Sequence, residues 1–372
     1  MKPRRILHVV SSLARGSGVM SVIMNIYQNL DKSNVQFDFI FFKDVNDSYE
    51  NEITSYGGEI YKIPRPSIKG MLTFYSFTSN FFKENSEKYT ALQIHEVYLC
   101  SILAPVAKRN GIKNIIAHCH NTMYADKFVN SIRNRVLCLP LKRVVDINFA
   151  CSVAAGEFLF GKKAMRTGKV RVINNAIDCD KYKFDQDTRN NIRNELSIND
   201  KFVIGHVGRF NEQKNHTQLL DIFVEIKKIR SNSQLLLVGE GPLKDYIKEK
   251  AETLGISKDI LFLGQRSDVD RLLQSMDVFI MPSLFEGLPV VGIEAQATGL
   301  LCYMSDEVTE EVSISNLYFK SLNVPPHEWA NDIIENFNGF QRKNNSLVIK
   351  RSGFDIKVEA KKTENYYLEL NN

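Results

Sequence analysis

The stretch Pro282-Ser-Leu-Phe-Glu-Gly-Leu-Pro-Val-Val-Gly-Ile-Glu-Ala295 places two carboxylates on either side of a proline that would begin a helix. Pro289 is tolerated there because its φ is fixed near the helical value and a first-turn N–H would be unpaired anyway. The free amides of a helix start bind anions, and Gly287 lets a phosphate approach the backbone. Glu286 then lies in the loop, and Glu294 lies about one and a half turns into the helix. A phosphate site with a carboxylate for hydroxyls on each side predicts binding of a nucleotide sugar.

A second stretch, Gly205-His-Val-Gly-Arg-Phe-Asn-Glu-Gln-Lys-Asn215, puts two cations after a predicted strand. The strand ends at Gly208, where the missing side chain lets a ligand approach the backbone. Arg209 follows at once, and Lys214 comes near the start of the next helix. Two cations suit a diphosphate, since charge-assisted contacts are worth about 1.5–3 kcal/mol each. Fixed positive charge would also stabilise the charge that develops on a departing nucleoside diphosphate.

Taken alone, these glutamates and cations would be solvated surface residues in most proteins. Together they resemble the Glu-x7-Glu and Gly-Arg-x4-Lys motifs of retaining GT-B glycosyltransferases of family 4, and the likeness covers nearly the whole chain. The resemblance implies that Arg209 and Lys214 hold the pyrophosphate, that Glu286 binds the donor sugar, and that Glu294 holds the ribose. It also implies substrate contacts at Gly208, Gly287, Leu288 and Pro289. One departure is Leu301, where relatives carry proline, and it is expected to alter only a turn.

A third stretch, Ile115–Thr122, brings His118 and His120 to one face at the end of a strand. A lone histidine is more often a core residue. The resemblance implies a catalytic strand-end histidine beside the donor sugar, which we identify with His120, keeping His118 as a second choice. Asn121 begins the following loop and is a predicted substrate-binding residue.

The loop Arg15–Ser21 joins a strand to a helix and is similar to a dinucleotide-binding loop, but such a pattern alone is weak. Asp38 follows about twenty residues later at the start of its strand, where ribose recognition would want an acid at the end. The family resemblance instead implies that Gly16 and Gly18 meet the donor through backbone amides. Arg266 stands in a loop that resembles the one beneath the nucleotide base.

Short apolar runs alternate with helical patterns, which predicts parallel sheets covered by helices. We expect an α/β, GT-B fold of two doubly wound, Rossmann-like domains with an interdomain cleft. The acceptor-side domain is expected over residues 1–178 and the nucleotide-sugar-binding domain over 179–353. Residues 354–372 predict a terminal amphipathic helix, which the resemblance implies crosses back to the first domain. Strands are expected at 6–11, 37–42, 59–63, 91–95, 115–118, 147–150, 170–174, 202–208, 234–238, 260–263 and 278–281, and helices at 19–30, 217–229, 243–254, 269–274 and 289–298.

Composition narrows the class of protein. The 372 residues are 44% hydrophobic and 24% charged, which is typical of two globular domains. A net charge of +5 suits anionic substrates or an anionic lipid surface but is too small to indicate nucleic acid. The six cysteines form no Cys-x-x-Cys pair, which favours reduced core residues in a cytoplasmic protein. The histidines and carboxylates show no metal-ligand spacing, so no metal and no cofactor is expected.

Residues 127–143 mix basic and apolar side chains. Arg133, Arg135, Lys142 and Arg143 lie among valines, leucines and an isoleucine, and Pro140 interrupts the run. Such a patch is typical of peripheral contact with an anionic membrane, here the inner face of the cell membrane. A surface helix whose leucines face the core fits the pattern equally well, so both interpretations stay open.

The sequence as a whole predicts a retaining, metal-independent hexosyltransferase. It would move a sugar from a nucleotide-sugar donor, expected to be UDP-linked, to a hydroxyl of a glycan or lipid-linked oligosaccharide in capsule or exopolysaccharide biosynthesis. A nucleotide-sugar 2-epimerase and a non-catalytic partner subunit of a glycosyltransferase are the alternatives. Product analysis with donor alone separates the epimerase, and the intact charged residues of the two motifs disfavour the inactive partner.

Overall fold

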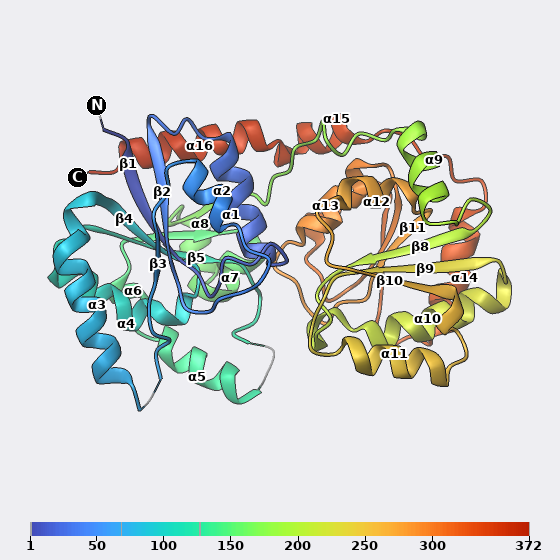
Figure 1. Cartoon of the computed structure of the whole chain (residues 1–372), viewed down its shortest axis with the longest axis horizontal. Coiled ribbons are helices and arrows are strands. Elements are labelled where there is room, and N and C mark those ends of the chain that lie inside the picture. Colours follow the sequence, from blue (N-terminus) through green and yellow to red (C-terminus); the bar gives the residue numbers. More distant parts are fainter. Residues whose placement is uncertain (1, 68, 126–127, 372) are drawn as a thin grey trace. The chain divides into compact units, whose positions relative to one another are not determined.

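The computed structural model describes residues 2–67, 69–125 and 128–371, and its chain divides into two compact units. The first unit consists of Met1–Ala176 with Ile356–Asn372, and the second of Ile177–Asp355. Figure 1 shows that each unit is a sheet covered by helices on both faces. The prediction of two doubly wound α/β domains is confirmed.

The first unit is built on a seven-stranded parallel sheet in the order β3-β2-β1-β4-β5-β6-β7. Strand β1 pairs with β2 on one side and β4 on the other, so the strand order reverses at β1. In such sheets ligands bind where the order reverses, at the carboxyl ends of the strands. The strands are β1 (Arg4–Val9), β2 (Val35–Phe41), β3 (Ile60–Lys62), β4 (Tyr89–Ile94), β5 (Asn114–Cys119), β6 (Ile147–Ala150) and β7 (Val170–Val172).

Asp38 lies inside a buried strand, where Arg5 and a backbone N–H compensate its charge. Every residue of β2 is buried, and Asp38 receives a bidentate pair of hydrogen bonds from Arg5 at 2.5 and 2.6 Å. It also accepts from the backbone N–H of Glu59 on the neighbouring segment at 2.6 Å. Its oxygens are therefore used within the sheet, which fits the expectation that it does not serve a dinucleotide site.

Helices cover this sheet, and the last of them comes from the far end of the chain. α16 (Ile356–Glu369) packs against α1 (Gly18–Asn29), and Glu364 on α16 accepts from the backbone N–H of Asp31 at 3.0 Å. The hydroxyl of Tyr367 donates to Gln93 on β4 at 2.7 Å. The other helices are α2 (Glu50–Ser55), α3 (Met71–Asn85), α4 (Cys100–Arg109), α5 (Phe128–Cys138), α6 (Leu141–Val144), α7 (Val153–Phe160) and α8 (Lys162–Arg166).

The second unit has a six-stranded parallel sheet in the order β10-β9-β8-β11-β12-β13, which reverses at β8. Trp329 and Phe223 are fully buried in its core. The strands are β8 (Phe202–Val207), β9 (Ser233–Val238), β10 (Ile260–Gly264), β11 (Val278–Met281), β12 (Leu301–Ser305) and β13 (Leu317–Lys320). The helices are α9 (Gln186–Glu195), α10 (His216–Ile229), α11 (Lys244–Thr253), α12 (Val269–Ser275), α13 (Val290–Ala297), α14 (Pro326–Phe337) and α15 (Ser346–Ile349).

One local expectation was wrong. Leu301, expected in a turn, is the first residue of β12, pairs with Val278 and is 1% exposed. A leucine can be accepted there because the position is part of the core, where an apolar side chain is stabilised by burial and a proline would lack a ladder N–H.

Candidate functional site

The carboxyl edge of the second sheet carries a close ion pair. Lys214 Nζ lies 2.6 Å from Glu286 Oε1, and their side chains are only 14% and 9% exposed. Lys214 ends a 3₁₀ turn (Glu212–Lys214) after β8, and Glu286 lies in the loop after β11. Because β8 and β11 are neighbours at the point where the strand order reverses, the two sequence motifs meet at the expected edge.

Hydrogen bonds to backbone groups connect the loop that contains Lys214 to the loop that contains Glu286. The N–H of Leu284 donates to the carbonyl of Gln213 at 2.8 Å, and Gln213 Nε2 donates to the carbonyl of Phe285 at 3.0 Å. Asn211 caps the 3₁₀ turn by accepting from the N–H of Lys214 at 3.3 Å. The positions of Lys214 and of the Glu286 loop are thus set by the same network.

Glycines shape the floor of this site. A Cβ on Gly208 would lie 3.1 Å from both Cγ and Cδ of Lys214, so a side chain there would push the lysine away. Gly239 has a φ of +139°, and a Cβ on it would lie 2.1 Å from the carbonyl oxygen of Gly208. Arg209 is exposed and makes no ion pair with any residue that the structure describes. Its guanidinium is therefore available to an anion.

The helix start predicted to bind phosphate is present. Pro289 is the residue just before α13, with φ −71° and ψ 115°, and Leu288 is buried at 4% exposure. Glu286 forms a parallel bridge with Val308, which holds the loop against the segment after β12. The prediction of a helix starting at Pro289 was one residue early, since the helical geometry begins at Val290.

Glu294 lies on α13 in a different environment from Glu286. Its Oε1 accepts a hydrogen bond from the hydroxyl of Tyr182 at 2.6 Å. Burial raises the pKa of Glu294 to about 7, and the Tyr182 hydrogen bond opposes this rise in part. Tyr182 was not predicted, since it lies in the connection before α9 without any motif around it.

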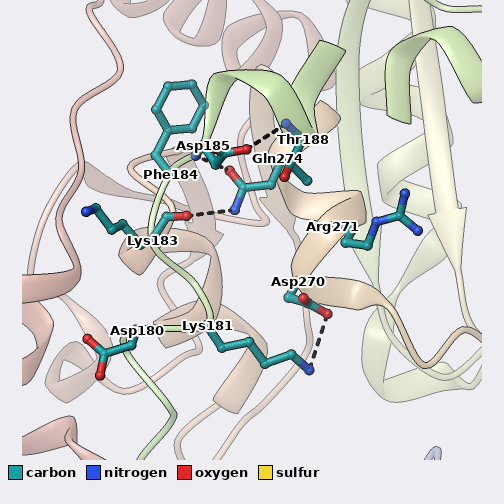
Figure 2. Close-up of a pocket in the computed structure, with 9 residues that line it drawn as sticks. All are labelled: Asp180, Lys181, Lys183, Phe184, Asp185, Thr188, Asp270, Arg271 and Gln274. Atoms are coloured by element: carbon teal, nitrogen blue, oxygen red, sulfur yellow. Dashed lines mark hydrogen bonds and ion pairs between the residues drawn. The ribbon is translucent and has the colours of Figure 1, made fainter. Parts of the chain in front are cut away.

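An open pocket of about 320 Å³ lies beside this connection (Figure 2). Gln274 donates to the carbonyl of Lys183 at 3.2 Å and accepts from the N–H of Asp185 at 3.3 Å, and Lys181 pairs with Asp270 at 3.3 Å. These contacts attach the connection to α12, so the pocket's polar groups have a structural use. The predicted binding residues do not line it; the lining residues are Asp180, Lys181, Lys183, Phe184, Asp185, Thr188, Asp270, Arg271 and Gln274.

Arg266 is held by acids close to it in the fold. Its guanidinium forms two hydrogen bonds of 2.7 Å to Asp268 and lies 3.7 Å from Glu195. Hydrogen bonding to Asp268 raises the pKa of Arg266 further. With its side chain engaged in this way, contact with a nucleotide base would fall to the backbone of this loop.

Four histidines gather at the centre of the first sheet; His8, His95 and His118 are buried, and His120 is partly exposed. His8 Nδ1 lies 2.9 Å from His95 Nε2, and His95 Nδ1 lies 2.8 Å from His120 Nε2. The fourth, His118, lies 3.1 Å from the side-chain nitrogen of Gln93. His95 follows β4 as His120 follows β5, so the strand order brings together residues far apart in the sequence.

Burial keeps these rings neutral. It lowers the pKa of His8 and of His120 to about 3, and the pKa values of His95 and His118 lie well below the usual value. Neutral imidazoles can bind metals, and one nitrogen each of His95, His118 and His120 lie within 4.8 Å of one another. The rings of His118 and His120 pack against each other, however, with centroids 4.1 Å apart and a tilt of 36° between their planes. A metal would require these rings to turn toward a common point.

The remaining predicted residues lie around the carboxyl edge of the first sheet. Gly18 is the first residue of α1, and a Cβ on it would meet nothing within 4 Å, so local packing does not require glycine there. Gly16 is exposed in the preceding turn, and Asn121 is exposed in the loop after β5. Both are accessible to a ligand.

Two known families match the chain, one in each half. Residues 16–181 match the family described as glycosyltransferase family 4, and residues 187–343 match the family described as glycosyl transferases group 1. The putative glycosyltransferase EpsF of Bacillus subtilis is 36% identical over 337 residues, which cover 89% of this chain and 87% of that protein. The capsular polysaccharide biosynthesis glycosyltransferase CapH of Staphylococcus aureus is 23% identical over 98% of both chains.

Solved structures share the fold. Anabaena HepE in complex with UDP-glucose matches with a TM-score of 0.79 and 19% identity, over 97% of this chain and 98% of that one. WaaG, a glycosyltransferase involved in lipopolysaccharide biosynthesis, matches with a TM-score of 0.72 and 13% identity, over 97% and 99% of the two chains. At such low identities the likeness shows the fold alone.

Proposed function

We propose that this chain, which belongs to the GT-B glycosyltransferases of family 4, transfers a sugar with retention from a UDP-linked donor to a hydroxyl of a growing glycan. The chain is a glycosyltransferase of polysaccharide or glycan biosynthesis; the donor, the stereochemistry and the acceptor are what we propose. The observation that carries the proposal is the Lys214–Glu286 pair of 2.6 Å at the edge where the strand order reverses.

The pair supports a donor site because each of its two residues can bind a different part of the donor. A largely buried carboxylate and ammonium are stable together but costly alone, so each compensates the charge of the other while the site is free of ligand. We propose that Lys214 turns to the diphosphate when the donor binds, which frees Glu286 for the hydroxyls of the donor sugar. Arg209 and the amides at Gly287 and Leu288 add further contacts to the anion.

The chemical step follows from where charge develops. The bond from the anomeric carbon to the phosphate oxygen breaks as the acceptor hydroxyl attacks from the same face, and the departing phosphate takes the acceptor proton. Arg209 and Lys214 stabilise the charge gained by the departing UDP. Glu286 positions the sugar and forms no covalent bond. Because two cations do this work, we expect the rate to be unchanged by EDTA.

The carboxyl group of Glu294 is proposed to hold the ribose. Its partner Tyr182 donates a single hydrogen bond and leaves the second carboxylate oxygen for ribose hydroxyls. Relatives support a UDP donor: the name of an Escherichia coli protein, 32% identical over 142 residues that make up 37% of each chain, is UDP-Gal:alpha-D-GlcNAc-diphosphoundecaprenol alpha-1,3-galactosyltransferase. The same name motivates a lipid-linked acceptor here.

A surface of the first unit supports contact with the membrane that would carry such an acceptor. On α5 and just after it, Phe128, Val129, Ile132, Val136 and Leu139 are each 51–79% exposed, so these side chains do not face the core. Arg133 and Arg135 are exposed on the same helix. Because an α-helix turns about 100° per residue, the two arginines lie on opposite sides of the apolar stripe. This pattern favours contact with an anionic lipid surface. Lys127 of the predicted basic stretch lies outside the described residues. No helix among the residues placed by the structure has the length and apolar character to cross a membrane.

The proposal is tested with the purified chain and a panel of nucleotides. UDP is expected to raise the melting temperature, and a UDP-sugar with a polyprenyl-diphosphate glycan should give a product whose new linkage has the donor's anomeric configuration. Lys250→Ala is a matched control, because Lys250 pairs with Asp221 at 2.7 Å with 19% exposure but lies in neither motif. Stabilisation by GDP alone, or an inverted linkage, would contradict the proposal. Conversion of the donor without any acceptor would favour the 2-epimerase instead.

A further inference from the structure

Three buried polar atoms belong to residues that line one small cavity between the first sheet and helices α1 and α16. The cavity has a volume of about 10 Å³ and is lined in part by His8, His118 and Thr363. His8 Nε2, His118 Nε2 and Thr363 Oγ1 are all buried, and none has a hydrogen-bond partner among the residues that the structure describes. A buried polar atom without a partner costs about 1–3 kcal/mol, so three of them around one space indicate an occupant. This volume is near the lower limit for one water molecule, which needs two to four polar partners.

Tyr367 on α16 determines which groups donate and which accept in the hydrogen bonds of Gln93 and His118. Tyr367 donates its hydroxyl proton to Gln93 Oε1 at 2.7 Å, so the other end of that amide is the NH₂ group. The NH₂ group of Gln93 faces His118 Nδ1 at 3.1 Å and donates to it. The neutral His118 ring must then carry its proton on Nε2, which is buried and has no partner among the described residues. His118 is thus a donor toward the cavity.

A water molecule in this cavity would link His118 to His8 and determine which nitrogen of His8 accepts a hydrogen bond. It accepts from His118 Nε2–H, donates to His8 Nε2, and exchanges its remaining hydrogen bond with the hydroxyl of Thr363. His8 Nε2 is then an acceptor, so the proton of the neutral His8 ring is on Nδ1. Nδ1 donates to His95 Nε2 at 2.9 Å, and His95 Nδ1 donates in turn to His120 Nε2 at 2.8 Å.

We propose that one water molecule occupies this cavity and closes an unbroken chain of hydrogen bonds from Tyr367 to His120, which fixes the ring proton of His120 on Nδ1. Every donor in this chain meets one acceptor, which satisfies the three otherwise unpaired atoms at once. The low pKa values of the four histidines support it, because each neutral ring offers one donor and one acceptor. His8, His95, His118 and Gln93 are positioning residues that act through His120.

The consequence for catalysis rests on the proposed function. A His120 ring whose Nε2 accepts from His95 can offer only Nδ1–H to a substrate, so it donates a hydrogen bond to a sugar oxygen and does not act as a base. Reversing the amide of Gln93 would reverse each bond in the chain and leave Nδ1 as an acceptor. The hydrogen bond that the hydroxyl of Tyr367 donates to Gln93 Oε1 favours the orientation described.

The test reads the ring protons directly and needs no substrate. The full chain is labelled with ¹⁵N-histidine, and two-bond proton–nitrogen correlation spectra give the tautomer of each ring, assigned with single His→Gln variants. We expect Nδ1–H at His8, His95 and His120 and Nε2–H at His118. Tyr367→Phe removes the hydroxyl that orients Gln93, so His118 and His120 should each populate both tautomers. Tyr366→Phe is the control, since Tyr366 precedes Tyr367 but packs edge-on against Phe149 and takes no part in this series of hydrogen bonds.

Several outcomes would overturn the proposal. They are Nε2–H at His120 in the wild-type protein, tautomers in Tyr367→Phe identical to wild type, or stoichiometric zinc bound through these histidines in the purified protein. If Tyr367→Phe does not fold, the wild-type spectrum alone still decides. In transfer assays kcat of Tyr367→Phe should fall about tenfold, as expected for one misdirected hydrogen bond. A lower kcat with unchanged tautomers would assign Tyr367 a packing role only, whereas correct tautomers without any transferase activity would count against the proposed function and leave the chain of hydrogen bonds intact.

Discussion

Lys214 and Glu286 follow neighbouring strands of one sheet, 72 residues apart in sequence, and their charged atoms lie 2.6 Å apart. Arg209, on the same loop as Lys214, is exposed and lacks an acidic partner in the described part of the chain. Of the two cations of one motif, Lys214 is therefore paired and largely buried, whereas Arg209 is exposed. This difference separates their contributions to stability from their contributions to catalysis.

Replacing Lys214 and Arg209 by alanine should have unequal effects on stability. Lys214→Ala leaves Glu286 without its partner and should lower the free energy of unfolding by about 3 kcal/mol, while Arg209→Ala should leave it within about 0.5 kcal/mol of wild type. Both should reduce kcat by one to two orders of magnitude, roughly 1.5–3 kcal/mol of lost charge stabilisation. Denaturant unfolding and UDP-release assays measure the two effects. Wild-type rates in both variants would show that the diphosphate binds elsewhere.

Removing the carboxylate of Glu286 should stop transfer without unfolding the protein. Glu286→Gln keeps the shape and an oxygen acceptor for Lys214 but removes the counter-charge, so it should destabilise the protein less than Lys214→Ala does and leave it folded. Transfer should be lost because the amide cannot hold the sugar hydroxyls with the strength of a charged acceptor. UDP should still stabilise the variant, since Lys214 and Arg209 are unchanged. Retained activity would remove the role assigned to Glu286.

The ionisation of Glu294 should make stability depend on pH. Its pKa is raised from 4.5 to about 7, so between these values the folded state keeps a proton that the unfolded state has lost. The free energy of unfolding should therefore fall as pH rises through this window, by at most about 3 kcal/mol, and level off above it. Glu294→Gln retains an oxygen for Tyr182 but cannot ionise, and should not show this fall. Parallel pH dependences in the two proteins would refute the assignment.

The exposed apolar stripe on α5 can be tested with lipid vesicles. Phe128→Ser and Ile132→Ser should each weaken co-sedimentation with anionic vesicles by about tenfold, because each removes apolar area that the lipid would bury. Leu72→Ser on α3 is the matched control, since Leu72 is 88% exposed outside the basic stretch. Binding to neutral and anionic vesicles alike, or to neither, would end the membrane proposal.

The sequence was sufficient for the fold and for the main motifs. Apolar runs and helix starts predicted strands such as β8 and helices such as α13 within one residue, because burial and capping act locally. Leu301 was misplaced because its burial depends on pairing with β11, which a turn-like local sequence does not reveal.

The histidine chain and the Tyr182–Glu294 hydrogen bond could not be predicted. His8, His95 and His120 lie on or after three strands, and only the order of those strands in the sheet makes them neighbours. His95 carried a weak signal, since it ends one predicted strand and His120 follows shortly after another. Tyr182 carried none. The sequence also could not show whether the apolar side chains of α5 face the core or the solvent, because both arrangements give the same helical pattern.

The packing of α16 on α1 has a consequence for how the protein is made. The second unit is one continuous segment, Ile177–Asp355, whereas the first needs a helix that leaves the ribosome after all of that segment. During synthesis the second unit can close while the first still waits for Tyr367 to reach Gln93. Protease resistance of stalled nascent chains should therefore appear in the second unit before the first, the reverse of their order in translation.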